Sequence, residues 1–239
     1  MTTLATHIAE RIHALRFEDI SSAALDWTAS AFVDTVGVAL AGMQEPGPGI
    51  LMRVPGVSTA KGPALILGTS RRTTALDAAL VNGTAAHALD YDDVAGSLGG
   101  HPSAMLVPML LPLAEMLGRP GRDVVLAYVV GFETMCHIAR GVNHHHYEKG
   151  WHPTATLGVF GTVAAASRML GLDTARTATA LGIATSFASG LKANFGTMTK
   201  PLHVGHAVRD GLLAALLAEG GFTANPAAFE HKQGFLDVF

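Results

Sequence analysis

Apolar residues recur at helical spacing along most of the chain. Near the N-terminus Leu4, Ile8 and Ile12 lie four residues apart, which is typical of a helix with one side against a core. Comparable patterns, bounded by hydroxyl residues, prolines or glycines, predict eight helices, over residues 3–15, 23–41, 73–89, 104–117, 123–140, 154–170, 174–189 and 205–219.

Few stretches favour strands. Residues 64–68, A-L-I-L-G, suit a short strand within an irregular segment, 51–73, and residues 45–49, E-P-G-P-G, are expected to be a turn-rich linker. No internal repeat is found. The chain is therefore predicted to be all-α, a compact multi-helix domain over residues 1–239.

The helix expected over residues 23–41 is apolar on nearly every side, because Ala, Val and Gly dominate its second half, D-T-V-G-V-A-L-A-G. Such a helix is usually buried among its neighbours. We expect it to be enclosed on most sides and approached closely by other helices.

Hydrophobic residues make up 49% of the 239 residues, and the mean hydropathy is +0.33. The apolar runs are nevertheless interrupted, by Pro108 and Pro112 or by Gly158 and Gly161, and none reaches the roughly 18 to 20 residues that a membrane span needs. The N-terminal segment lacks the basic head and apolar core of a secretory signal. We expect a cytoplasmic protein with no membrane partner.

Charge and cysteine content exclude further classes. A net charge of -3 and a pI near 6.4 give no broad positive field, so nucleic acid is not an expected partner. Cys136 is the single cysteine, which excludes an internal disulfide and a Cys-rich zinc or iron–sulfur site. We interpret Cys136 as a small buried apolar residue.

Although only 15% of the chain is charged, three carboxylates and two imidazoles gather within residues 82–103. They are His87, Asp90, Asp92, Asp93 and His101. If the preceding helix extends to Asp90, then His87 and Asp90 lie on one helical face, ahead of a glycine-rich loop that presents His101. This pattern favours one wall of a binding site. The alternative is that the aspartates cap or solvate a helix end and that His101 is a hydrogen-bonded core histidine.

Two histidines share a local pattern, because His101-Pro-Ser103 and His152-Pro-Thr154 each precede an apolar helix. Proline suits the first helical turn, so both imidazoles are expected at helix N-termini. The helix dipole there favours anions and lowers a histidine pKa, so a neutral imidazole could act as a base beside a substrate carboxylate. The alternative is that these residues serve only the local turns.

A third polar group lies in G-T-M-T-K-P-L-H, residues 196–203, with His206 three residues on. It is not a phosphate-binding loop, because Thr199 stands where that motif requires glycine. Lys200 is either an exposed loop lysine or a cation that holds a carboxylate, and the sequence leaves both open.

Metal, serine-hydrolase and dinucleotide motifs are not found. His144-His-His is the one candidate for a metal site, but consecutive side chains do not face one ion, and neither H-E-x-x-H nor a paired cysteine motif accompanies it. No G-x-S-x-G elbow and no G-x-G-x-x-G after a strand occurs. We predict no metal and no organic cofactor.

Five segments together resemble the MmgE/PrpD family, which includes 2-methylcitrate dehydratase, cis-aconitate decarboxylase and iminodisuccinate epimerase. They are D-T-V-G-V-A-L-A-G at 34–42, N-G-T-A-A-H-A-L-D-Y-D-D at 82–93, H-P-S-A at 101–104, H-Y-E-K-G-W-H-P-T-A-T-L-G at 146–158 and F-G-T-M-T-K-P-L-H at 195–203. The resemblance implies that Asp90, His101, His152 and Lys200 line the active site as catalytic residues. We expect the substrate contacts to be His87, Ser103, Thr154, Thr199, His203 and His206.

The chain departs from the family pattern in three ways. Val94 and Ala95 stand where members commonly have Thr with a His soon following, and His206 stands where many have Arg. Members also carry a second, α/β domain that closes over the helical one and contributes site residues, and these 239 residues do not include it.

The resemblance and the residues together predict a cofactor-independent lyase of the dehydratase type acting on a small hydroxy-polycarboxylate. One of His101 and His152 exchanges a proton on carbon and the other assists loss of hydroxide, while Lys200 holds a carboxylate and Asp90 orients a histidine. The alternatives are an isomerase, epimerase or decarboxylase, or a non-catalytic helical module or half of a split enzyme. The expected partners are a small carboxylate and either a second copy or a separate chain that supplies the α/β domain.

Overall fold

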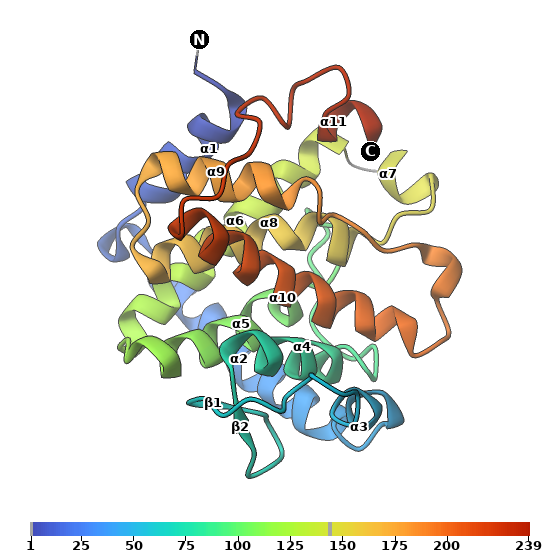
Figure 1. Cartoon of the computed structure of the whole chain (residues 1–239). Helices are drawn as coiled ribbons and strands as arrows, with labels where there is room; N and C mark the ends of the chain where they lie inside the picture. The colour runs from blue at the N-terminus through green and yellow to red at the C-terminus, as the bar shows by residue number, and fades with distance from the viewer. Residues whose placement is uncertain (1, 143–144) are drawn as a thin grey trace.

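The computed structural model describes residues 2–142 and 145–239, and the fold is all-α, as predicted (Figure 1). Two short strands, β1 (Ala64–Leu65) and β2 (Arg72–Thr73), pair antiparallel at one end. The helices are α1 (Leu4–Ala14), α2 (Ser22–Gly42), α3 (Pro46–Leu51), α4 (Ala75–Ala86), α5 (Pro102–Leu117), α6 (Gly121–Val142), α7 (His145–Glu148), α8 (Pro153–Leu170), α9 (Thr174–Ala184), α10 (Thr199–Glu219) and α11 (Phe235–Val238), with 3-10 turns at η1 (Phe17–Asp19) and η2 (Lys192–Asn194).

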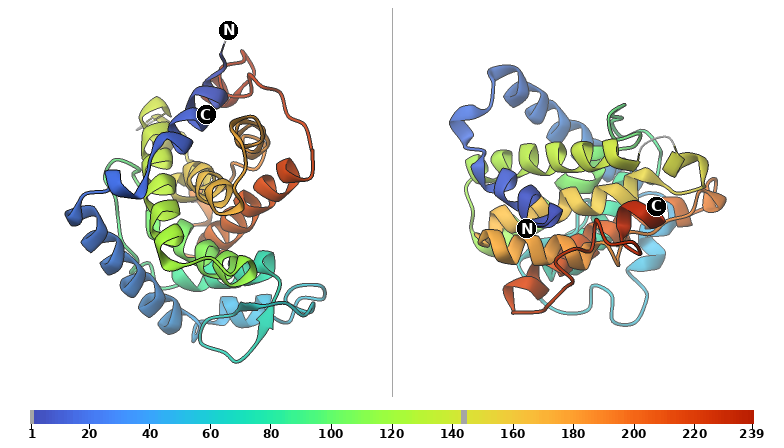
Figure 2. Two further views of the ribbon diagram at one scale, coloured as in Figure 1. Left: turned by 90° about the vertical axis from the view of Figure 1, so that its left-hand side faces the viewer. Right: turned by 90° about the horizontal axis from the view of Figure 1, so that it is seen from above.

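Helix α8 lies at the centre, packed against α5, α6, α9 and α10 (Figure 2). Its residues 153–167 are all buried. Glycines let the neighbours come close, because a Cβ on Gly131 of α6 would lie 2.7 Å from the carbonyl oxygen of Gly161, and one on Gly211 of α10 would lie 2.6 Å from Thr162. This packing holds the N-terminus of α8, which carries His152, in a fixed position.

Helices α4 and α10 cross at two glycines. A Cβ on Gly83 would lie 3.0 Å from the Cα of Gly205, and a Cβ on Gly205 would lie 2.3 Å from the carbonyl oxygen of Leu80. Only residues without a side chain permit this approach. The crossing brings the end of α4, with His87, beside the beginning of α10, with Lys200.

The prediction that residues 23–41 form a helix is confirmed, but the prediction that this helix is enclosed is wrong. Helix α2 lies along the outside of the molecule (Figure 2, left). One side packs on α4, α5 and α6, while the side chains of Trp27 and Val33 are each 77% exposed. Its all-round apolar character therefore leaves an apolar surface without a partner in the described chain.

Several helix ends differ from the predictions. Helix α4 ends at Ala86 rather than 89, α9 ends at Ala184 rather than 189, and α10 begins at Thr199 rather than 205. The beginning of α10 was predicted too late because of Pro201. A proline is tolerated in the first turn of a helix, where its missing N–H would not be hydrogen-bonded. The linker predicted at 45–49 instead forms the start of α3, again because prolines suit a first helical turn.

Among the described helices, α6 alone is long and apolar enough, by length and composition, to cross a membrane. Of its most apolar stretch, 56% is buried inside the domain, chiefly against α8. Cys136, on the same helix, is a buried free cysteine, as predicted.

Candidate active site

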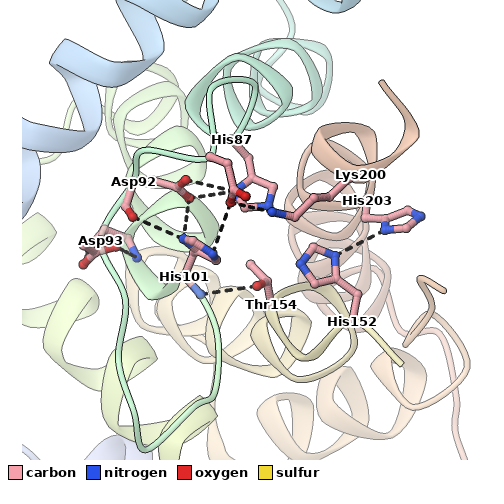
Figure 3. A network of polar contacts seen from close by, with 10 residues as sticks. His87, Asp92, Asp93, His101, His152, Thr154, Lys200 and His203 are labelled. Carbon is pink, nitrogen blue, oxygen red and sulfur yellow. Dashed lines mark hydrogen bonds and ion pairs between the residues drawn. The ribbon is translucent and has the colours of Figure 1, made fainter. Parts of the chain in front are cut away.

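The polar residues singled out in the sequence meet where α4 ends and α5, α8 and α10 begin (Figure 3). His101 and His152 are the N-cap residues of α5 and α8, each followed by proline, as predicted. The Thr154 Oγ1 accepts a hydrogen bond from the His101 backbone N–H at 3.3 Å, so the two helix ends are joined. A Cβ on Gly100 would lie 2.7 Å from that Oγ1, so this junction requires glycine.

His87 does not share a helical face with Asp90, contrary to our expectation. The helix ends at Ala86, and Asp90 adopts the left-handed conformation with φ 52°, which turns the chain away from the helix path. The His87 Nδ1 instead lies 2.8 Å from Oδ2 of Asp92, and both side chains are fully buried. Asp92, rather than Asp90, is therefore the carboxylate that orients His87.

The contacts of His101 determine which of its nitrogens carries hydrogen. Its Nδ1 lies 3.2 Å from the backbone carbonyl oxygen of Asp92 and 3.3 Å from Oδ2 of the same residue. A carbonyl oxygen only accepts, so Nδ1 is the donor. In the neutral ring, Nε2 then has a free lone pair, and it lies 3.6 Å from Oδ1 of Asp90.

Asp90 forms an ion pair with Lys200 across the site. Partial burial alone would raise the pKa of Asp90, but the hydrogen bond and charge of Lys200, helped by His87 and His101, bring it below its usual value. The Lys200 side chain is only 13% exposed and lies 5.1 Å from the centre of the Phe195 ring. Lys200 is therefore not an exposed loop lysine.

His152 is a neutral imidazole in this structure. Burial, followed by the proximity of His87 and His203, lowers its pKa to about 2. Its Nδ1 lies 3.2 Å from the Nδ1 of His203, whose pKa burial also lowers. The ring centre of His87 lies 5.5 Å from that of His152 and 4.6 Å from that of His101, so three imidazoles stand in a row.

Three predicted substrate contacts are occupied elsewhere. The buried Ser103 hydroxyl is bonded to Asp93 and lies 2.7 Å from the Tyr128 hydroxyl. His206 is half exposed and lies 3.1 Å from Asp210, one helical turn along α10. Thr199 begins α10, and its backbone N–H donates to the Thr197 Oγ1 at 3.2 Å. A role of these three residues in substrate binding stays a prediction.

A network behind the loop was missed from the sequence. Asp93 accepts the Ser103 backbone N–H at 3.0 Å and caps the start of α5, and burial raises its pKa. Tyr128 comes from the distant helix α6, and burial raises its pKa to about 12. No local pattern in the sequence indicates that Tyr128 lies beside Ser103. This network anchors the loop that carries Asp90 and His101.

Four of the side chains could in principle surround a cation, because His87, Asp90, Asp92 and His101 offer ligand atoms within 4.8 Å of one another. Asp90 already holds the Lys200 ammonium, and Asp92 accepts from both imidazoles. The absence of a metal stays a prediction. Of the three consecutive histidines, His144 lies outside the described residues. His145 is exposed and His146 is buried, so these two side chains do not face one ion.

The site is open to solvent. The Asp90 side chain is 58% exposed, and the apolar residues beside the site in sequence are also exposed: Leu89, Tyr91, Leu191 and Met198. Val94, which replaces the family's usual threonine, is 70% exposed. Two cavities, of about 870 and 490 Å³, lie between α1, α2 and α6 and between α2, α6 and residues 93–95 behind the site.

A family model described as the MmgE/PrpD N-terminal domain matches residues 6–239. The chain belongs to the MmgE/PrpD family. The cis-aconitate decarboxylase of Homo sapiens is 32% identical over 98% of this chain and 50% of its own length. That of Mus musculus is 38% identical over 66% and 33%, and that of Aspergillus terreus is 30% identical over 94% and 48%. The chain thus spans at most about half the length of these curated relatives.

The structure shows where the residues implied by the MmgE/PrpD resemblance lie. The residues that the family resemblance implied, Asp90, His101, His152 and Lys200, come from three separate parts of the sequence and lie together in the fold. His203 lies next to His152, as expected. Asp92 was part of the polar cluster in the sequence but had no assigned role, although its carboxylate contacts two imidazoles, those of His87 and His101.

Proposed function

We propose that this chain is the helical part of a cofactor-independent lyase that decarboxylates cis-aconitate or a closely related unsaturated polycarboxylate. One observation carries the proposal: Asp90, His101, His152 and Lys200 meet at one site in a chain whose relatives are named cis-aconitate decarboxylase. Those names favour decarboxylation over the dehydration that we predicted from the sequence. In both reactions charge is created or removed on a carbon next to a carboxylate, and the site must stabilise it.

The site suits binding of an anion with several carboxylates. The N-termini of α5 and α8 point partial positive charge at the site, and Lys200 adds a full charge. Asp90 holds Lys200 in place until a substrate carboxylate reaches its ammonium. A polycarboxylate supplies both a group for Lys200 and a group for the helix ends.

The imidazoles divide the proton chemistry between them. In decarboxylation the bond from carbon to the departing carboxylate breaks and carbon dioxide leaves. The electron pair of that bond forms a new double bond to the neighbouring carbon, and the electrons of the original double bond move to its far carbon, which takes up a proton. His101 is suited to give that proton from Nε2, because Asp92 holds its Nδ1 while its Nε2 lies at the side of the site where Asp90 and Lys200 meet. His152, with a pKa of about 2, stays neutral and acts through hydrogen bonds.

An α/β domain completes the site in this proposal, either in the same protein or as a separate chain. The support is the exposed apolar rim beside the site, formed by Leu89, Tyr91, Leu191 and Met198, together with the half-length match to the relatives. Covering the rim would exclude water from the reacting groups and strengthen their interactions.

The test is a product assay in deuterated water with the chain alone and with the α/β domain of a relative supplied separately. Cis-aconitate should lose carbon dioxide and gain one deuterium on carbon. Loss of water from 2-methylcitrate would favour the dehydratase alternative instead, and exchange without loss of either would favour an isomerase. His101→Ala and His152→Ala should each lower turnover by about 10² or more. If neither substrate is converted in any combination, the lyase proposal fails.

A further inference from the structure

Asp92 stands out because one buried carboxylate contacts two imidazoles. Asp92 is 5% exposed, and its Oδ1 and Oδ2 lie 3.0 and 2.8 Å from the Nδ1 of His87. The same Oδ2 lies 3.3 Å from the Nδ1 of His101, which also contacts the Asp92 backbone carbonyl oxygen at 3.2 Å. Carboxylates that bind one histidine nitrogen commonly determine what the other nitrogen does.

These contacts select the same tautomer in both rings. A carboxylate accepts hydrogen bonds, so the Nδ1 of His87 and the Nδ1 of His101 both donate to Asp92. In the neutral rings, both Nε2 atoms are therefore without hydrogen. Asp92 thus presents two basic nitrogens from separate segments, the end of α4 and the start of α5, to one region.

His87 supplies the second observation. The residue is 1% exposed, and its Nε2 is buried with no hydrogen-bond partner in the described part of the chain. Buried polar atoms without partners are rare and are often found where a ligand binds. The ring lies between those of His101 and His152, so this nitrogen belongs to the site and not to the apolar core (Figure 3).

We propose that Asp92 is a positioning residue that holds His87 and His101 in the Nδ1–H tautomer, so that both Nε2 atoms face the substrate. His87 is then a buried contact for the substrate and His101 the group that moves the proton. The roles of His87 as a substrate contact and of His101 in proton transfer rest on the proposed lyase function, whereas the assignment of the two tautomers does not. The role of Asp92 differs from that of Asp90, which pairs with Lys200 at the solvent-exposed side of the site.

The tautomers can be tested without any enzyme assay. Long-range ¹H–¹⁵N NMR spectra of the labelled chain distinguish the two neutral forms of imidazole, and the signals are assigned by their loss in His87→Gln and His101→Gln. Both rings should show hydrogen on Nδ1. A neutral Nε2–H form in either ring of the wild-type chain would overturn the proposal, and this result does not depend on whether any variant of Asp92 folds.

The role of Asp92 is tested by Asp92→Asn, with Asp93→Asn as the matched control, because Asp93 contacts Ser103 and not an imidazole. In Asp92→Asn the backbone carbonyl oxygen of residue 92 still accepts from the Nδ1 of His101, whereas His87 faces an amide whose nitrogen donates, so the His87 ring should change to the Nε2–H form. Turnover should fall by about 10² to 10⁴, as when the carboxylate that orients a catalytic histidine is changed to an amide, and KM should rise as well because His87 contacts the substrate. Asp93→Asn should leave both tautomers unchanged.

An Asp92→Asn protein with wild-type tautomers, or with its loss confined to KM, would contradict the proposal. If the NMR result holds while no substrate is turned over, the lyase function fails and the positioning role stands.

Discussion

At the scale of single residues, we expect substrate binding to depend on the charge of Lys200. Its ammonium is bonded to Asp90, and replacing that contact with a substrate carboxylate retains a charge-assisted hydrogen bond. Lys200→Ala should therefore raise KM by about 10- to 100-fold, the equivalent of a hydrogen bond to a charged group, with a smaller effect on kcat.

Lys200→Arg should restore binding only in part, because a planar guanidinium replaces a compact point charge. Lys192→Ala is the control, since the Lys192 ammonium contacts the Tyr147 carbonyl oxygen at 3.1 Å, outside the polar cluster. Steady-state kinetics with the active assembly measures all three variants. An unchanged KM in Lys200→Ala would mean that the lysine only stabilises Asp90.

Two buried neutral histidines should make the fold sensitive to acid. Burial lowers the pKa of His146 to about 4 and that of His152 to about 2, whereas both side chains take up a proton near pH 6.5 in the unfolded chain. Between pH 6.5 and 4 the unfolded state binds more protons, so the free energy of unfolding falls as the pH falls. Each histidine contributes up to about 1.4 kcal/mol per pH unit.

Urea unfolding at pH 7 and pH 5 measures this slope. His146→Gln should reduce the difference by about 2 kcal/mol at most, because glutamine cannot take up the proton but can still donate to Thr156 in place of the ring Nε2. His7→Gln is the control, since that side chain is 67% exposed. The same difference in wild type and His146→Gln would rule out this origin of acid sensitivity.

The sequence predicted which polar residues come together better than it predicted how they connect. Histidines before prolines selected His101 and His152, whereas the sequence left Lys200 open between a loop lysine and a carboxylate contact, and the family resemblance placed it with the others. The bond from His87 to Asp92 was not predictable, because it depends on the left-handed turn at Asp90 that ends the helical periodicity. Tyr128 joins the loop from a helix far away in sequence, and no spacing rule indicates such a contact.

At the scale of elements, the existence of the long helices was predicted and their ends were not. Periodic apolar positions report which side of a helix is buried, and this signal holds for α1 and α6. The ends depend on single capping residues and on prolines that are tolerated in a first turn, as at Pro46 and Pro201. Those errors matter for function, because the beginning of α10 places Lys200 in the site.

The crossing of α4 and α10 should be intolerant of any side chain. A Cβ at position 205 would lie 2.2 Å from Thr84 Oγ1 and 2.3 Å from the Leu80 carbonyl oxygen, and backbone cannot rotate away. Gly205→Ala should lower the free energy of unfolding by about 3 kcal/mol, the upper end for overpacking, and weaken substrate binding because His87 and Lys200 separate.

Gly37→Ala on α2 is the matched control, because a Cβ there meets nothing within 4 Å. That change should raise the free energy of unfolding by about 0.4 to 1 kcal/mol, since alanine restricts the unfolded chain and suits a helix. Urea unfolding curves of the two variants provide the comparison. Equal stability of the two proteins would show that the helices separate at the crossing without cost.

At the scale of the whole molecule, two groups of exposed apolar side chains bear on assembly. One is the rim of the active site, which we propose is covered by an α/β domain. The other runs along α2, where Trp27, Val33 and Leu40 are 77%, 77% and 45% exposed. The charges on α2 are two aspartates, so this surface carries little to keep it in water.

We expect the α2 surface to bind a second copy of the chain. A helix of 21 residues is about 30 Å long, and two copies related by a two-fold axis bury the same apolar side on both. Trp27→Lys and Val33→Lys should each shift the chain from dimer to monomer in light scattering after size exclusion. Phe222→Lys removes another exposed apolar residue, 60% exposed and outside α2, and should leave the dimer intact.

Because α2 and the site rim are separate surfaces, adding the α/β domain should restore activity without dissociating the dimer. A wild-type chain that stays monomeric at micromolar concentration, or a Phe222→Lys variant that dissociates as readily as Trp27→Lys, would exclude α2 as the contact.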